Sequence, residues 1–86
     1  MFIDFLVSKY FCNKGKKATN KKEYGKALKY YEKSVEWSSS PFFVYYLGLA
    51  YFNLENFNKS IEYFDKALKL DSEFEDAFFF ENSSFN

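Results

Sequence analysis

Few side chains in this sequence of 86 residues are of the kinds that catalyse reactions or hold metal ions. It contains one Cys, Cys12, and neither His nor Arg. A single thiol without imidazoles excludes the common zinc sites and a disulfide within the chain. Lys and carboxylates remain, but their pairs follow the spacing of a helix surface and no glycine-rich phosphate loop accompanies them. The sequence therefore predicts a protein that is not an enzyme and that carries no metal or cofactor.

Aromatic residues are the other unusual feature of the composition. Thirteen Phe and eight Tyr bring the aromatic fraction to 26%. A small domain buries too little surface to hide so many large apolar side chains, so some of them should face water or a partner. Nucleotide bias in the genome is an alternative explanation, because every basic residue is Lys and because Phe, Tyr and Asn are all abundant.

The charges balance overall but not along the chain. Residues 1–37 hold nine Lys and four acids, a net charge of +5, whereas residues 38–86 hold three Lys and eight acids, a net charge of −5. Solvated helix faces explain this pattern most simply, and a basic docking patch or head-to-tail association is the alternative.

The opening residues are apolar but do not form a targeting signal. They lack a basic start and a small-residue cleavage site, and Asp4 interrupts the run, so we expect a helix. No stretch reaches eighteen uninterrupted apolar residues. We therefore expect no membrane span and a cytoplasmic protein.

Apolar residues at helical spacing predict four helices, over residues 3–20, 24–37, 41–54 and 57–70. Ser40 before Pro41 is a start signal for the third of these, with Ser40 as cap and Pro41 as the first helical residue. The third and fourth helices are joined so closely, at Glu55 and Asn56, that they must fold back as an antiparallel hairpin. A capping box at Ser72 predicts the start of a fifth helix.

The apolar positions also predict which helix faces are buried. On the first helix these are Ile3, Leu6, Val7, Tyr10, Phe11 and Ala18. On the fourth they are Ile61, Phe64, Ala67 and Leu68. The third helix has two separate apolar stripes, one formed by Phe43, Val44, Leu47, Ala50, Tyr51 and Leu54 and the other by Phe42, Tyr45, Leu49 and Phe52. A single hairpin cannot bury both stripes.

The sequence contains an internal repeat. A shift of 33 positions, which we call the repeat period, places residues 25–37, GKALKYYEKSVEW, over residues 58–70, NKSIEYFDKALKL. It also places Gly15 over Gly48 and Tyr24 over Phe57. Such a period indicates a solenoid of stacked units, each too small to bury its apolar face alone.

Residues 41–74 resemble one tetratricopeptide repeat. The residues in register with that pattern are Val44, Leu47, Gly48, Ala50, Tyr51, Phe57, Ser60, Phe64, Ala67 and Leu68. Val44 replaces the usual Trp, and Ser72 replaces a Pro. The preceding unit agrees in its second helix, but Lys14 and Ala18 depart from the pattern in its first helix, as does Glu81 in the trailing segment.

The resemblance implies an all-α fold, a short right-handed α-solenoid of antiparallel helix hairpins. Residues 1–86 would form one domain, with unit one at about 8–40, unit two at 41–74, and a capping helix or partial third unit at 75–86. The chain would be a protein–protein interaction module that binds a peptide or a partner helix in a concave, aromatic-lined groove. The implied groove residues are Phe42, Tyr45, Tyr46, Leu49, Phe52 and Asn53, with Cys12 and Lys16 from unit one.

One subfamily grips the C-terminal carboxylate of its ligand with Lys and Asn on successive first helices. The matching positions here hold Cys12, Lys16, Tyr46, Asp76 and Phe80. Only Lys16 is a cation, and Asp76 would repel a carboxylate, so this chaperone-type clamp is not expected.

Other interpretations stay open at this point. The groove aromatics could only pack against neighbouring helices, or the chain could be a fragment of a longer repeat array without a function of its own. A helical-hairpin repeat that reads RNA is a weaker alternative, in which Tyr residues would stack on bases. The acidic second half argues against nucleic acid, which needs a continuous basic face.

Exposed aromatics near the ends of the chain also predict self-association. A solenoid is normally closed by helices with polar outer faces, whereas the last residues here include Phe78 and Phe79. We therefore expect a homo-oligomer that depends on these two residues, in which the start of one chain pairs with the end of another.

Overall fold

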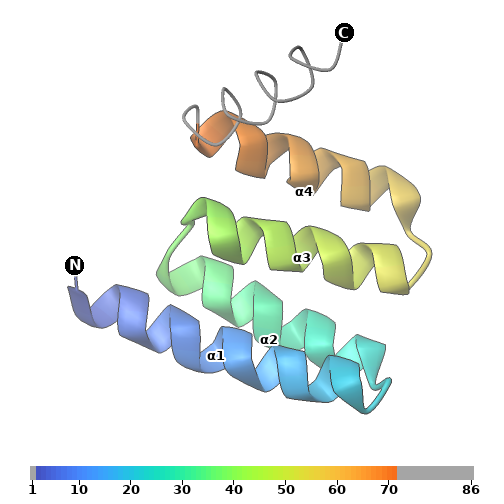
Figure 1. Cartoon of the computed structure of the whole chain (residues 1–86), viewed down its shortest axis with the longest axis horizontal. Coiled ribbons are helices and arrows are strands. Elements are labelled where there is room, and N and C mark those ends of the chain that lie inside the picture. The colour runs from blue at the N-terminus through green and yellow to red at the C-terminus, as the bar shows by residue number, and fades with distance from the viewer. Residues whose placement is uncertain (1, 72–86) are drawn as a thin grey trace, which may run out of the picture.

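A computed structural model of the chain describes residues 2–71, which form four helices and no strand (Figure 1). Their bounds are α1, Phe2–Asn20; α2, Tyr24–Trp37; α3, Pro41–Asn53; and α4, Phe57–Leu70. The four predicted helices are confirmed, each within one residue at either end. The expected fifth helix and the residues Phe78 and Phe79 lie outside the described residues.

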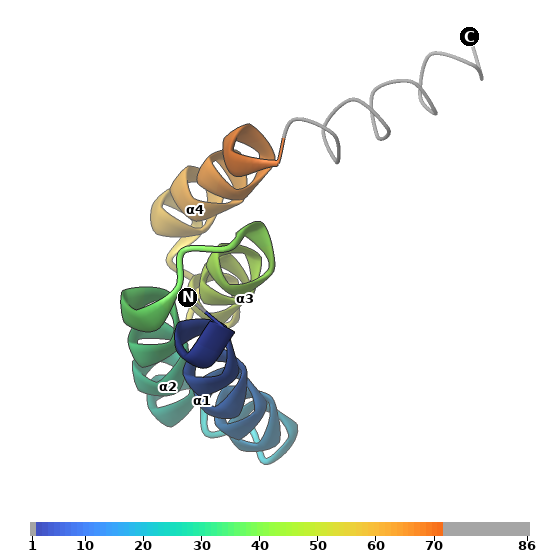
Figure 2. The same cartoon turned by 90° about the vertical axis from the view of Figure 1, so that its left-hand side faces the viewer.

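Each helix runs antiparallel to the one before it (Figure 1). The closest packing is within the two hairpins, α1 with α2 and α3 with α4, and α2 packs against α3 to join them. In Figure 2 the α1–α2 hairpin lies below the α3–α4 hairpin. α1 also contacts α3, so the first helices of the two hairpins are neighbours. The fold is thus the expected all-α stack of helix hairpins.

The turns inside the two hairpins are copies of each other. Lys22 and Glu55, which are one repeat period apart, have φ angles of 63° and 62°. The next amide in each turn donates back to the preceding helix, from Glu23 to the Ala18 carbonyl over 2.8 Å and from Asn56 to the Tyr51 carbonyl over 2.9 Å. This is how a left-handed residue closes a helix and satisfies its last carbonyls.

Helix starts differ in how they are capped. Pro41 is the first residue of α3 and Ser40 is its N-cap, as predicted, but the Ser40 side chain makes no capping hydrogen bond. At α4 the Asn56 side chain accepts a hydrogen bond from the Lys59 amide over 3.4 Å.

The prediction of the buried face of α1 is confirmed at Ala18 and was wrong at three of its six residues, while Val7 and Phe11 are partly buried. Ile3, Leu6 and Tyr10 are exposed, and the buried residues are small: Ser8, Cys12, Gly15 and Ala18. Small residues let α2 pack close to α1. The face of α1 that is buried is therefore the one that permits the closest approach of the two helices, not the most hydrophobic one. Ser8 also joins the helices directly, because its hydroxyl donates to the Ser34 carbonyl over 2.6 Å and the Ser34 hydroxyl donates to the Ser8 carbonyl over 2.8 Å.

The predicted face of α4 is confirmed at Ala67, which is buried, but not at Ile61, which is 65% exposed. Phe64 and Leu68 are partly buried. Leu28, the counterpart of Ile61 one repeat period earlier, packs against the core because α3 covers that side of unit one. Ile61 lies on the corresponding side of unit two.

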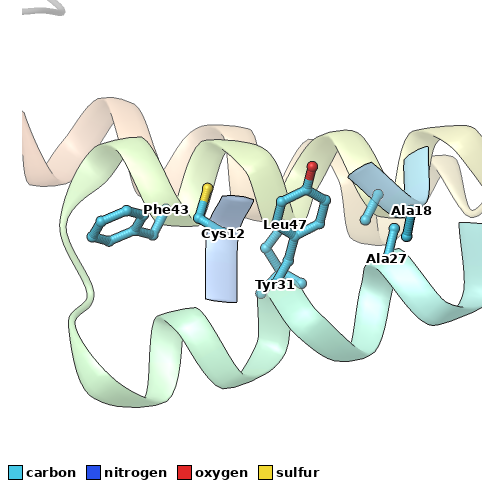
Figure 3. Packing of buried hydrophobic residues seen from close by; sticks show 7 residues of the cluster. Cys12, Ala18, Ala27, Tyr31, Phe43 and Leu47 are labelled. Carbon is cyan, nitrogen blue, oxygen red and sulfur yellow. The ribbon is translucent and has the colours of Figure 1, made fainter. Parts of the chain in front are cut away.

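The core lies where α1, α2 and α3 meet (Figure 3). Cys12 lies beside Phe43, and Tyr31 and Leu47 follow along the same cluster. The close approach expected at Gly48 is confirmed, since a Cβ built there would lie 2.8 Å from the Phe64 ring. Gly15 makes the equivalent approach to Tyr31, at 2.6 Å. Within the described residues, no helix is both long enough and apolar enough to cross a membrane.

Candidate functional site

The neighbouring first helices, α1 and α3, have a groove between them. It consists of two adjoining hollows of about 210 and 300 Å³ that share Lys16 and Tyr46. The first hollow is lined by Phe5, Lys9, Cys12, Asn13, Lys16, Phe42, Phe43 and Tyr46. The second is lined by Lys16, Thr19, Asn20, Tyr31, Tyr46, Leu49 and Asn53. We call these two hollows the α1–α3 groove.

Six of the eight predicted groove residues line the α1–α3 groove. They are Cys12, Lys16, Phe42, Tyr46, Leu49 and Asn53. Tyr45 and Phe52 point elsewhere, since their rings lie 5.4 Å from those of Phe64 and Phe57 in α4. Cys12 is only 3% exposed, so it forms the floor of the groove.

Sequence reasoning missed several polar residues of the groove. Lys9, Thr19 and Asn20 line it from α1. One repeat period later, the same positions hold Phe42, Phe52 and Asn53. The internal repeat thus carried the signal for Lys9 and Asn20, whose counterparts Phe42 and Asn53 also line the groove, but not for Thr19, whose counterpart Phe52 contacts α4.

A stack of aromatic rings under a cation forms the centre of the groove. The Lys16 ammonium lies 4.5 Å from the centroid of the Tyr46 ring, a cation–π distance. Tyr46 in turn stacks on Tyr31, with ring centroids 5.7 Å apart and ring planes 17° apart. Thr19 and Tyr31 hydroxyl oxygens are 3.5 Å apart. These contacts hold Tyr46 in a fixed orientation with part of its surface still open to a ligand.

The electrostatics of the groove are simple. Lys9 and Lys16 are the charged side chains among the described residues that line it. Burial raises the pKa of the Cys12 thiol, and nearby Lys16 lowers it by a smaller amount. Burial also raises the pKa of the Tyr31 phenol. Both groups therefore stay neutral at pH 7, so the groove offers a positive, aromatic surface rather than a nucleophile.

A third hollow lies between the start of α3 and the end of α4. It has a volume of about 390 Å³ and is lined by Pro41, Phe42, Tyr45, Tyr46 and Asp71. Phe42 and Tyr46 border both this hollow and the groove. Among residues 2–71, no three His, Cys, Asp or Glu side chains come together as they would around a metal ion.

Comparison with known families agrees with the repeat seen in the fold. The tetratricopeptide repeat is matched twice, over residues 8–41 and over residues 44–74. The chain belongs to the tetratricopeptide repeat family. No curated protein and no solved structure matches it.

Membership of the family fits the geometry of the two units. Each tetratricopeptide repeat is one helix hairpin, α1–α2 and then α3–α4, with the glycines Gly15 and Gly48 at the closest approach inside each. Tetratricopeptide repeats generally mediate contacts between proteins, and the family is typically a scaffold without catalytic activity. The chain is thus a protein–protein interaction module in this general sense.

Proposed function

We propose that the chain binds a peptide or a partner helix in the α1–α3 groove. The observation that carries the proposal is the Lys16–Tyr46–Tyr31 stack, which presents a cation and an aromatic ring edge on a rigid floor. Aromatic side chains give large contact areas with little loss of conformational entropy. Lys9 at one end of the groove adds a second positive charge, so a ligand with apolar and acidic side chains fits best.

The size of the groove supports a short ligand segment. Two hollows of about 210 and 300 Å³ hold a few side chains, which is the scale of an anchor pocket rather than of a whole domain interface. Leu49 and Asn53, one turn apart on α3, give the far hollow an apolar wall and an amide. The Asn53 amide can form hydrogen bonds with a ligand backbone. The apolar wall at Leu49 can bury a ligand side chain.

A selection from a library of 12-residue peptides displayed on phage tests the proposal. We expect that changing Lys16 and Leu49 together to Ala weakens binding of the selected peptides at least about tenfold, which is about 1.4 kcal/mol. Lys16 is exposed and Leu49 is only partly buried, so the free energy of unfolding should change by about 1 kcal/mol or less.

Lys29→Ala is the matched control, because Lys29 is exposed on α2 and outside the groove residues. This control should bind the peptides as the parent does. Equal binding by the parent and the double variant would show that the peptides bind somewhere else. A large loss of stability in the double variant would show that these side chains serve the core.

Self-association is a second candidate function. The observation that favours it is an apolar surface on the far side of unit two, formed by Tyr45, Ile61, Phe64 and Leu68, which we call the open face. Tyr45 is 42% exposed and Ile61 is 65% exposed. Phe78 and Phe79 of a second copy are the residues that we expect to take part in this association.

A further inference from the structure

We infer that unit one binds the surface of an anionic lipid membrane. The contact is made by two neighbouring stripes of side chains, Ile3 to Lys21 on α1 and Lys26 to Trp37 on α2, which we call the outer face. In Figure 2 the first hairpin lies at the end of the stack of described helices, so one of its sides has no described helix over it. This inference goes beyond ligand binding in the α1–α3 groove and does not depend on it.

The stripe on α1 is apolar at its start and basic at its end. Its apolar residues are Ile3, Leu6 and Tyr10, which are 67%, 47% and 56% exposed. Its basic residues are Lys14, Lys17 and Lys21. The two halves meet where the Lys14 ammonium lies 5.6 Å from the centroid of the Tyr10 ring. A helix that exposes aliphatic and aromatic side chains beside Lys can lie in the plane of a membrane interface.

The basic half of the outer face surrounds a hollow near the turn between α1 and α2. This hollow has a volume of about 130 Å³, and its lining includes Lys14, Lys17, Lys21 and Lys26. Glu23 is the one carboxylate among the described residues that line it, so four ammonium groups less one carboxylate give a net charge of +3. Lys binds phosphate as a point charge. The hollow is therefore suited to the phosphate group of a lipid headgroup.

The stripe on α2 continues the outer face across the hairpin. It consists of Lys26, Tyr30, Lys33 and Trp37, at the spacing of one helix face. The Lys33 ammonium lies 5.9 Å from the centroid of the Phe11 ring. Phe11 packs edge-on against Tyr10, with ring centroids 5.3 Å apart. The two stripes are therefore joined through Phe11 into one surface.

The apolar ends of the two stripes lie together. Trp37 is 48% exposed and is the last residue of α2. Because α1 and α2 are antiparallel, the end of α2 lies beside the start of α1, where Ile3 and Leu6 are (Figure 1). Trp and Tyr are enriched at the headgroup level of membranes, and Lys is attracted to the anionic headgroups there. The outer face thus has apolar side chains at one end of the hairpin and ammonium groups at the other.

Aliphatic side chains favour a membrane over a nucleic acid as the occupant of the outer face. Stacking on bases uses aromatic rings and phosphate contacts use Lys, so Ile3 and Leu6 would add little to either. A bilayer takes up aliphatic side chains directly beneath its anionic headgroups. A membrane is therefore the partner for which the whole of the outer face is used.

A further helix hairpin is a poor occupant for the outer face. One repeat period after Lys14 and Lys17, the residues Leu47 and Ala50 are buried against unit one, at 3% and 1% exposed. A hairpin packed in the same way on α1 would take two ammonium groups out of water without a partner, which is unfavourable. A surface of lipid phosphates supplies those partners instead.

Charge complementarity also orients the molecule. Residues 1–37 hold nine Lys and four acids, whereas residues 38–71 hold three Lys and four acids. An anionic surface therefore attracts the first hairpin and slightly repels the second. Unit one would face the membrane, and unit two would face away from it.

Sedimentation of the full chain with lipid vesicles tests the inference. Vesicles of phosphatidylcholine with about 30% phosphatidylserine should bind the parent at least about tenfold more tightly than vesicles of phosphatidylcholine alone. Lys17→Gln combined with Lys21→Gln should weaken binding to the anionic vesicles at least about tenfold, because both ammonium groups face the headgroups. Equal affinity for the two kinds of vesicle, or binding to neither, would overturn the inference.

Lys59→Gln combined with Lys69→Gln is the matched control, because it removes the same charge at two exposed positions on α4. This control should change binding to the anionic vesicles by about twofold or less, since salt screens charges that lie far from the surface. Equal losses in the two double variants would contradict the assignment of the outer face, because total charge alone would then decide binding.

A second pair of variants tests the apolar half of the outer face. Leu6→Ser should weaken binding to the anionic vesicles at least about threefold. Leu70→Ser, at a position that is 54% exposed on α4, should leave binding unchanged. Circular dichroism should give thermal midpoints within about 4 °C of the parent for all of these variants, since each changed position is exposed. Binding by Leu6→Ser as tight as that of the parent would rule out insertion of α1 into the membrane.

Trp37 gives a measurement that needs no variant, since it is the one Trp in the sequence. Its emission should move to shorter wavelength when the anionic vesicles are added and stay unchanged with phosphatidylcholine vesicles, because its ring enters the interface only of the former. Unchanged emission with the anionic vesicles would contradict the inference. A chain that binds single-stranded RNA but neither kind of vesicle would show instead that the outer face takes nucleic acid.

Discussion

At the helix contacts, buried serine residues allow close packing and can form hydrogen bonds between helices. Ser8 and Ser34 are fully buried, and each hydroxyl donates to the other residue's carbonyl. Two buried carbonyls are thereby satisfied beyond their helical bonds while the helices stay close. Ser60 is buried as well, but among residues 2–71 its hydroxyl has no hydrogen-bond partner. Its counterpart one repeat period earlier is Ala27.

Opposite effects of the same substitution follow from this difference. Ser34→Ala should lower the free energy of unfolding by about 1–2 kcal/mol, because it removes a buried hydrogen bond. Ser60→Ala should raise it by up to about 1 kcal/mol, because it removes a buried hydroxyl without a partner. Urea denaturation measures both. Equal destabilisation by the two substitutions would contradict the hydrogen-bond assignment.

At the scale of helices, the closest contacts are made by glycine. Gly48 of α3 lies against the Phe64 ring of α4, and Gly15 of α1 lies against the Tyr31 ring of α2. Gly25, in contrast, has no atom within 4 Å of where its Cβ would be. The three glycines thus divide into two that set the distance between helices and one that does not.

Gly48→Leu should therefore destabilise the protein by about 1–3 kcal/mol, because the added side chain overpacks the α3–α4 contact. Gly25→Leu is the matched control and should not lower stability, because it replaces a poor helix former at an open position. Circular dichroism during thermal denaturation compares the two variants. Similar midpoints for both would mean that α3 and α4 do not pack closely at Gly48.

Helix positions could be predicted from the sequence, but helix faces only in part. Turn residues and apolar spacing determined the bounds of all four helices to within one residue. On the buried face of α1, Ser8 and Cys12 were missed because they are small and the exposed Ile3 and Leu6 are more hydrophobic. Periodicity measures hydrophobicity, whereas this contact depends on size and on hydrogen bonds to a helix that is distant in sequence.

Six of the eight residues expected in the groove line the hollows between α1 and α3, and their role in binding a partner stays a prediction. The residues on α3 that face α1 were found, since the repeat pattern marks them. The sequence did not separate Tyr45 and Phe52 from them, because these two rings lie on the same largely apolar surface of α3 and only the position of α4 decides which rings it contacts. On the polar wall from α1, the repeat alone marks Lys9 and Asn20 as counterparts of Phe42 and Asn53, whereas Thr19 is placed in the groove only by the packing of α1 against α3.

At the scale of the whole molecule, the groups with clear pKa shifts among the described residues all hold their protons more tightly in the folded state. Burial is the main cause that raises the pKa of the Cys12 thiol and of the Tyr31 and Tyr51 phenols. Each group is neutral at pH 7 in both folded and unfolded chains. Above about pH 9 the unfolded chain loses these protons more readily than the folded one, so stability should fall.

We expect the free energy of unfolding to be constant from pH 7 to about 8.5 and to decrease between about pH 9 and 11. Cys12→Ala combined with Tyr31→Phe should make this decrease shallower, because it removes two of the three groups. Tyr10→Phe, at a position that is 56% exposed, is the control and should keep the slope of the parent. Urea denaturation at a series of pH values measures the slope. Identical slopes for the parent and the double variant would contradict the role of burial.

Cys12 is the one thiol in the sequence, and it lies under the contact between the two hairpins. Because only 3% of its surface is exposed, Cys12 should react with a thiol reagent mainly when the hairpins move apart or the chain unfolds. The rate of labelling therefore reports how often the two repeats separate in the native protein, without any added probe. Comparing that rate with the rate of global unfolding distinguishes a stack that opens one repeat at a time from one that opens all at once.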